Sequence, residues 1–329
     1  MRGTCSAVLS VFGVGASLVG RRMSAASGTP NFANRTVWTS DNLDILRGIN
    51  SECVDLIYLD PPFNSNRDYA APIGSAAAGA AFKDTWTLDD VDEAWHDEVE
   101  ERDGALHAVI EAAELAHGTG MKSYLIMMAV RLLELRRILK PTGSIYLHCD
   151  ATASHYLKLL MDVIFANAGG SFRNEIVWCY TGPGSPNQRQ FSRKHDTLFW
   201  YARGSSWTFN ADAVRVPHVG GKPHAGGFAS GLVHESIEDY GSKGKIPESW
   251  WPQQKGNGLA IAARQRKQYV GYPTQKPLAL LERIIKASSS PGDIVLDPFC
   301  GCATTLVAAE VLGREWIGID FVSACREAR

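Results

Sequence analysis

Short apolar segments alternate with longer stretches of helical periodicity along most of the chain. The segments of strand length are Thr36–Thr39, Val54–Leu59, Ser144–Cys149, Glu175–Tyr180, Thr197–Tyr201, Asp293–Leu296 and Trp316–Ile319. Apolar residues recur at helical spacing between many of them, as in Ser123–Lys140, which ends in basic residues before Pro141. This alternation predicts an α/β fold built on a mostly parallel sheet.

Three regions depart from the alternation. Only the sequence TGPGSPNQRQFSRKH separates Glu175–Tyr180 from Thr197–Tyr201, so we expect an antiparallel pair at one edge of the sheet. Tyr69–Gly120 is predicted to form a helical, acidic lid or arm. Ser205–Tyr272 is rich in Gly, Lys, Arg and His and is predicted to be a loop-rich insertion.

The chain therefore divides into four regions. Residues 36–204, with the insertion 69–120, and residues 273–329 form two parts of one domain, and residues 205–272 lie between them. Residues 1–35 form an N-terminal extension with four arginines and no acid. This extension is either a targeting segment or the product of an upstream start codon, and we favour the second, with Met23 as the true first residue.

The formal net charge is only −2, but the charged residues are unevenly distributed along the chain. Asp84–Glu114 contains twelve acids and one base, whereas Arg203–Lys276 contains ten Lys or Arg and five acids. Such a split indicates a local basic face, although solvated surface is the alternative for both segments.

Cysteine usage and hydropathy narrow the class of protein further. The seven cysteines are odd in number and scattered, which is typical of reduced thiols in the cytoplasm. Cys300 and Cys302 have no second pair and no nearby histidine, so no metal site is expected. No apolar run is long enough to span a bilayer.

The strand Val54–Leu59 ends in an unusual turn, Asp60-Pro61-Pro62-Phe63. Neither proline has an N–H, and each restricts the residue before it, so the strand cannot continue. Asp60 is therefore held at the carboxyl end of a central strand, where open α/β sheets bind their ligands. An acid that only caps a turn is the alternative.

A second motif lies between Gly292 and Phe321. It reads as a strand, a tight turn of small residues, a helix and a second strand that ends in Asp320. A turn of this kind lets the backbone approach a ligand at the helix N-terminus, and an acid at the next strand tip can hold ribose hydroxyls. The motif predicts a nucleotide site.

Three motifs in this order carry a family resemblance: Asp60-Pro61-Pro62-Phe63, Pro273-Thr274-Gln275-Lys276-Pro277 and Asp297-Pro298-Phe299-Cys300-Gly301. The chain resembles amino-group DNA methyltransferases of the permuted β class, which use S-adenosylmethionine, over roughly Thr36–Arg329. The segments LKPTGSIYLHCDATASHYLKLLMD and RKHDTLFWY add to the likeness. The resemblance implies a circularly permuted, Rossmann-like sheet to which Thr36–Thr39 supplies a strand.

The resemblance also implies the chemistry. Asp60 and the carbonyl of Pro61 would accept hydrogen bonds from the exocyclic amino group, Pro62 would stiffen the turn, and Phe63 would stack on a base flipped from the duplex. Phe63 stands where tyrosine is common. Asp196, next to His195, is expected to make only a structural hydrogen bond.

Cofactor contacts are implied at Asp41, Lys276, Asp297, Phe299, Gly301, Ala303, Thr304 and Asp320. Asp41 would face the adenine ring of the cofactor, or alternatively cap a helix. Lys276 would meet the methionine carboxylate, or alternatively be surface charge. Ala303 stands where glycine is more frequent, so cofactor affinity depends on how well alanine fits there.

DNA contacts are expected from Asn64, Arg67, Arg189, Arg193, Lys194, Arg264 and Arg266, and Ser205–Tyr272 is expected to read the target sequence. The function implied is methylation of adenine N6 in double-stranded DNA, in the cytoplasm and at the nucleoid. Cytosine N4, RNA or protein as substrate, and a DNA-binding module without activity are the alternatives. A homodimer or a partner restriction endonuclease stays open.

Overall fold

The computed structural model describes residues 27–64, 67–70, 81–84, 93–180, 189–218, 243–252, 261, 269–272 and 274–320. The prediction about the translation start concerns residues 1–22, which lie outside this set. Within the described part, no helix is long and apolar enough to cross a membrane.

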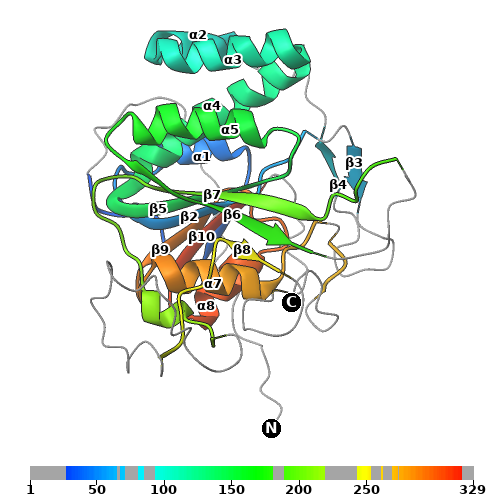
Figure 1. Ribbon diagram of the computed structural model, residues 1–329. Helices are drawn as coiled ribbons and strands as arrows, with labels where there is room; N and C mark the ends of the chain where they lie inside the picture. The colour runs from blue at the N-terminus through cyan, green and yellow to red at the C-terminus, as the bar shows by residue number, and fades with distance from the viewer. Residues whose placement is uncertain are drawn as a thin grey trace, which may run out of the picture.

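An eight-stranded sheet forms the centre of the described structure (Figure 1). In spatial order its strands are β1 (Thr36–Thr39), β10 (Glu315–Asp320), β9 (Ile294–Asp297), β2 (Val54–Leu59), β5 (Leu139–Cys149), β7 (His195–Ala202), β6 (Ser171–Cys179) and β8 (Trp250–Trp251). The first five run parallel, whereas β7 runs antiparallel to both β5 and β6. The predicted α/β fold, mostly parallel with an antiparallel pair near one edge, is confirmed.

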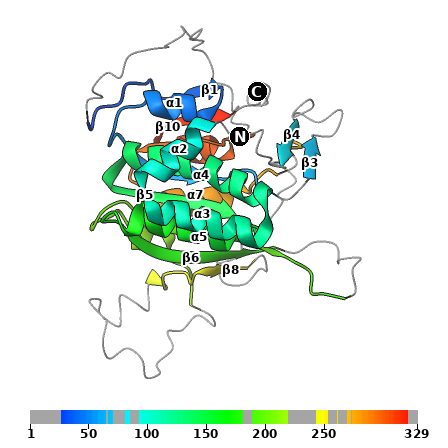
Figure 2. The same ribbon diagram turned by 90° about the horizontal axis from the view of Figure 1, so that it is seen from above.

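Two strands from opposite ends of the chain lie side by side in this sheet. β1 pairs in parallel with β10, which aligns Thr36 with Ile317 and Thr39 with Asp320 (Figure 2). The side chain of Asn34 accepts a hydrogen bond from the backbone N–H of Trp316, 2.9 Å away, at the start of the pairing. The first strand of the chain thus completes the sheet beside the last, as the permuted motif order predicts.

Both faces of β2 are covered by helices, which explains why this strand is apolar at every position except Asp55. Ile57 and Leu59 belong to one core, with residues of α1 (Asn42–Gly48), α4 (Thr119–Ile138) and α5 (Ser154–Met161). Leu56 and Tyr58 belong to the other core, with residues of α7 (Leu278–Ser288) and α8 (Thr304–Val311). Figure 1 shows these helix groups on opposite sides of the sheet. A π-helical turn, Asp162–Ala166, continues α5.

The helix α4 ends at Ile138, before the predicted end at Lys140. Leu139 already begins β5, and a register shift then separates the pair Val54 and Leu139 from the pair Leu56 and Ser144. The sequence Pro141-Thr142-Gly143 lies within this register shift, because proline has no N–H to donate to a regular strand ladder. A Cβ at Gly143 would lie only 2.9 Å from the carbonyl of Asp55.

The acidic insertion holds more than helices. Before α2 (Glu93–Arg102) and α3 (Gly104–His117), the strands β3 (Arg67–Ala70) and β4 (Ala81–Asp84) pair antiparallel. The sequence predicted a helical lid or arm here, and this pair of strands was not predicted. Leu106 and Ile110 on α3 are buried in the core that contains α4, and Figures 1 and 2 show α2 and α3 stacked outside α4 and α5.

The described parts of the second insertion are short. They include a 3₁₀ turn, Ala211–Val214, and β8, which adds to the sheet in parallel beside β6. The sequence predicted loops here and no strand. Trp251 is buried against α7, since Arg283 lies 5.0 Å from its ring centroid.

Candidate active site

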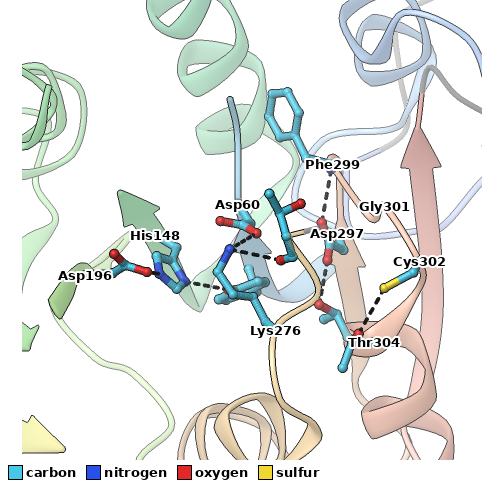
Figure 3. Close-up of polar contacts among 12 residues, drawn as sticks. Asp60, His148, Asp196, Lys276, Asp297, Phe299, Gly301, Cys302 and Thr304 are labelled. Carbon is cyan, nitrogen blue, oxygen red and sulfur yellow. Dashed lines mark hydrogen bonds and ion pairs between the residues drawn. The ribbon is translucent and has the colours of Figure 1, made fainter. Parts of the chain in front are cut away.

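Three acids meet at the carboxyl edge of the sheet. Asp60 follows β2, Asp297 ends β9, and Asp320 ends β10. These strands are parallel and occupy neighbouring positions in the order β10-β9-β2, so their carboxyl ends share one edge. Figure 3 shows Asp60 and Asp297 close together, with Gly301 and Thr304 in the adjoining turn.

The two carboxylate oxygens of Asp60 have different surroundings. Oδ2 accepts a hydrogen bond from Lys276 Nζ at 2.5 Å. Oδ1 is buried and accepts no hydrogen bond from any residue that the structure describes. A buried acceptor left without a donor costs about 1–3 kcal/mol. The geometry therefore presents a carboxylate oxygen that is ready for an incoming N–H donor.

Lys276 lies at Asp60, 216 residues away in sequence. Its Nζ also lies 3.4 Å from the carbonyl oxygen of Thr274 and 5.3 Å from the centroid of the Phe63 ring. An ammonium at this distance is attracted to the face of an aromatic ring. The resemblance predicted that Lys276 contacts the carboxylate of the cofactor, and that contact stays a prediction. The ion pair with Asp60 was not predicted.

The turn after Asp60 positions an aromatic ring. Phe63 faces His148, with ring centroids 5.9 Å apart and planes 30° apart. Asn64 has a φ of 57°, in the left-handed region that asparagine tolerates, and it is buried. Its conformation shapes the turn, and its predicted contact with the base or a phosphate is untested.

A buried hydrogen-bonded network lies directly behind the Phe63 ring. His148 Nε2 donates to Asp196 at 3.1 Å, and the Tyr58 hydroxyl lies 2.8 Å from His148 Nδ1. The Tyr180 hydroxyl donates to the other oxygen of Asp196 at 3.0 Å. Because a carboxylate only accepts, Nε2 carries the hydrogen, and in the neutral ring Nδ1 then accepts from the tyrosine.

The network explains one pKa in the site. Burial alone would raise the pKa of Asp196, but the hydrogen bonds from His148 and Tyr180 and the charge of Lys276 hold that pKa below its usual value. The predicted structural hydrogen bond of Asp196 is confirmed. The sequence analysis missed His148, although a histidine inside an apolar strand is a signal that a buried polar contact exists there.

Asp297 organises the second turn. It is fully buried and accepts from the hydroxyl of Thr305 at 2.5 Å and from the backbone N–H of Phe299 at 3.0 Å (Figure 3). Burial raises the pKa of Asp297 to about 7 despite these two bonds, and the charges of Asp60 and Asp320 add to the rise. Asp297 therefore holds the turn together from inside, and its predicted contact with the cofactor is untested.

The backbone of the turn closes onto Asp320. The N–H of Gly301 donates to the carboxylate of Asp320 at 2.7 Å. Ala303 has a φ of 66°, in the left-handed region, and Thr304 begins α8 directly after it. A positive φ favours glycine, which explains why glycine is more frequent at the position of Ala303 in the family that the sequence resembles. Asp320 at a strand tip fits ribose hydroxyls, and that contact stays a prediction.

Asp41 has two protein partners. Its Oδ1 accepts from the N–H of Leu43, which makes Asp41 the N-cap of α1, and both oxygens lie 2.9 Å from Arg131 Nη2. The helix-cap alternative is confirmed, and the proposed contact with the cofactor's adenine is untested. Arg131 was missed: the guanidinium is buried under α1 and also donates to Asn42 at 2.6 Å.

The predicted DNA contacts lie in different places. Arg189 and Arg193 are exposed and Lys194 is half-buried, all in the segment that enters β7. The backbone of Arg67 begins β3. Arg264 and Arg266 lie outside the described residues.

The strand order, the small-residue turn and the acids at the strand tips define a nucleotide-binding α/β domain of the Rossmann-like type. The chain belongs to a family described as DNA methylase, the N6 and N4 amino-methyltransferases, whose profile matches residues 54–327. The methyl donor of these enzymes is S-adenosylmethionine. The family predicted from the sequence is confirmed.

Individual relatives are distant. The chain is 27% identical over 290 residues to "DNA adenine methyltransferase YhdJ" of Escherichia coli (strain K12), covering 88% of this chain and 79% of the relative. It is 28% identical over 282 residues to "Type II methyltransferase M.HpaI" of Haemophilus parainfluenzae, covering 85% and 68%. Among solved structures, the M1.HpyAVI–SAM complex matches with a TM-score of 0.49 at 18% identity, over 88% of this chain and 94% of that one.

Replacing Ala303 with glycine is expected to stabilise the protein by up to about 1 kcal/mol, because glycine adopts a positive φ without the steric cost of a Cβ. Ala308→Gly, inside the helix α8 that follows Ala303, is the matched control and should destabilise by about 1 kcal/mol or more. Urea denaturation measures both. Destabilisation by both variants would contradict the left-handed conformation of Ala303.

Asp297→Asn tests the raised pKa of Asp297. Its folded pKa of about 7 exceeds the unfolded value, so the proton binds the folded state more tightly, and the associated stability is lost as pH rises through 7. Relative to the variant, the wild type should therefore lose roughly 2 kcal/mol between pH 5.5 and pH 8.5. Equal pH dependence of unfolding in urea for both proteins would contradict this.

Proposed function

We propose that the protein is a site-specific methyltransferase that transfers the methyl group of S-adenosylmethionine to N6 of adenine in double-stranded DNA. The observation that carries the proposal is the buried Oδ1 of Asp60, an acceptor that no described residue fills. It lies beside an aromatic ring at the edge of the sheet that also carries the nucleotide turn.

An exocyclic amino group is a poor nucleophile because its lone pair is delocalised into the base. A hydrogen bond from that amino group to Asp60 Oδ1, and a second to the carbonyl of Pro61, turns the lone pair towards the methyl donor. A bound donor would supply the methyl group and leave as a thioether, and the proton that the amino nitrogen loses as the C–N bond forms would pass along its hydrogen bond to Asp60 Oδ1. The stiff Pro61-Pro62 pair holds both acceptors in place, and such positioning supplies much of the rate of a direct transfer.

The base must leave the duplex to reach this site. Phe63 would stack on it from one side, and His148 supports Phe63 from behind, at 5.9 Å between ring centroids. Burial of Tyr58 and Asp196, the hydrogen-bond partners of His148, fixes this support. Stacking on an aromatic ring accepts any base, so the selection of adenine falls to the hydrogen bonds.

The donor supplies an electrophilic methyl group, and the residues at the strand tips fit its other parts. Asp320 would hold the ribose hydroxyls, Asp41 would face the adenine ring, and the turn at Gly301 and Ala303 would lie along the cofactor. Among the described residues Lys276 has two acceptors, Asp60 and the Thr274 carbonyl, and its ammonium has three N–H donors, so a third donor would serve the methionine carboxylate.

The acid at position 60 favours adenine over cytosine as the substrate, since the cytosine enzymes that the sequence resembles more often have serine at this position. A relative that is named a DNA adenine methyltransferase supports the same choice. The segment Ser205–Tyr272, with Arg264 and Arg266, would read the neighbouring bases in the grooves. We place the enzyme in the cytoplasm, at the nucleoid. A pull-down with a candidate endonuclease would test whether the protein has a restriction partner.

Nucleoside analysis tests the proposed function. Purified protein, genomic DNA that lacks methylation and labelled S-adenosylmethionine should yield labelled N6-methyladenine after digestion to nucleosides. Labelled N4-methylcytosine instead would establish the cytosine alternative. Label in neither, with cofactor and DNA both bound, would support the non-enzymatic alternative.

Asp60→Ala is expected to abolish methyl transfer, because Oδ1 serves the base, and to leave cofactor affinity within a few-fold of the wild type, because Lys276 keeps the Thr274 carbonyl as an acceptor. Asp150→Ala is the matched control: Asp150 follows β5 at the same edge but bonds to Thr152 at 2.8 Å, so activity should persist. Calorimetry measures cofactor binding and label incorporation measures transfer. Turnover by the Asp60 variant would remove the catalytic role.

A further inference from the structure

One aromatic side chain near the site has no place in the chemistry described so far. Phe191 is 99% exposed, the highest value among the large apolar side chains of the described residues. A single exposed apolar residue is ordinary on a protein surface and indicates nothing alone. Its surroundings decide whether Phe191 has a role.

The segment around Phe191 is basic. Arg189, Arg193 and Lys194 lie within three residues of Phe191, and no acid lies between Arg189 and Lys194. Arg189 and Arg193 are exposed, so both can be reached by a large anionic partner. An aromatic ring between cations matches the two parts of a nucleic acid, its bases and its phosphates.

The segment also starts from the edge of the sheet that carries Asp60. Because β7 is antiparallel to β5, its first residues pair with the last residues of β5, as Thr197 does with Cys149. The carbonyl of Lys194 accepts from the backbone N–H of Tyr180 at 2.9 Å, and Asp196 bonds to His148 behind the Phe63 ring. The base of the segment is therefore anchored to the network that supports the proposed base pocket.

The segment can reach beyond this anchor. Phe191 lies three positions before Lys194, and this stretch of chain spans at most about 11 Å when extended. Figures 1 and 2 both show the described part of this segment reaching outward from the end of β7, on the side of the molecule where β3 and β4 lie. An exposed ring is thus held close to the pocket but outside it.

We propose that Phe191 enters the DNA duplex beside the target nucleotide and occupies the space that the flipped base leaves, while Arg189 and Arg193 contact the flanking phosphates. This inference rests on the proposed function, because it requires a base that is extruded. Apolar and aromatic wedges stabilise unstacked steps by restoring contact with the exposed neighbouring bases. A stacking ring does not distinguish bases, so Phe191 assists extrusion and leaves the target sequence to other residues.

Two duplexes of identical sequence separate this role from a general one. The first contains the target adenine, located beforehand by mapping methylated positions in genomic DNA, paired with thymine. The second has an abasic site opposite the same adenine, so extrusion no longer breaks a base pair. Phe191→Ala is expected to lower kcat/KM about tenfold or more on the paired duplex and less than about threefold on the abasic duplex.

Two matched variants accompany Phe191→Ala. Phe191→Trp keeps a stacking ring and should restore activity on the paired duplex. Leu115→Ala removes another strongly exposed apolar side chain, 89% exposed on α3, and should behave as the wild type on both duplexes. Because Phe191 is exposed, thermal unfolding of its variants should match the wild type. A 2-aminopurine at the target position reports extrusion without turnover, and its fluorescence gain should be lost in Phe191→Ala alone.

If Phe191→Ala lowers kcat/KM equally on the two duplexes, or does not lower it on the paired duplex, the proposal that Phe191 acts as a wedge in the duplex is overturned. Wild-type protein that transfers no methyl group to either duplex would instead overturn the proposed function. The wedge would then be judged on binding to random-sequence duplexes. Phe191→Ala has to weaken binding to an intact duplex more than binding to one with an abasic site, and equal weakening would reject the wedge as well.

Discussion

The contact between Asp60 and Lys276 joins the two parts of the site. Asp60 follows the central strand β2, and Lys276 precedes α7, which packs with α8 on one face of the sheet. The ammonium occupies one carboxylate oxygen, and the other is buried and receives no hydrogen bond from the residues that the structure describes. Asp60 therefore keeps a charged partner while it offers a single directed acceptor. The prolines after Asp60 prevent the strand end from moving to satisfy that oxygen in another way.

The sheet order explains how residues so distant in sequence reach one edge. β1 pairs with β10, so the acid after the first strand, Asp41, lies near the acid that ends the last strand, Asp320. The Ser40 N–H donates to the Asp320 carbonyl at 3.2 Å, which fixes that proximity. Opening the chain between these strands leaves the sheet unchanged, because strand pairing and burial do not depend on where the chain begins. Motif order can therefore be permuted while the geometry of the site is kept.

Much of this arrangement could be predicted from the sequence. The bounds of β1 and β2 follow from apolar runs, and the acids at strand ends follow from the rule that parallel strands share an edge. Contacts made only by tertiary structure could not be predicted. β8 is two residues long and has no periodicity of its own. Arg131 reads as a charged position of an ordinary helix, yet it is buried because Asp41 lies 2.9 Å away across 90 residues of sequence.

The central claim is that Asp60 Oδ1 receives the amino group of the target base. A crystal structure of the protein with S-adenosylhomocysteine and a duplex containing the methylated site measures this directly. The account predicts an extrahelical adenine whose N6 lies about 2.7–3.2 Å from Asp60 Oδ1, with Lys276 still at Oδ2. An extrahelical base whose amino group binds a different acceptor, or a base that remains stacked while Asp60 Oδ1 turns to a protein donor, would contradict it.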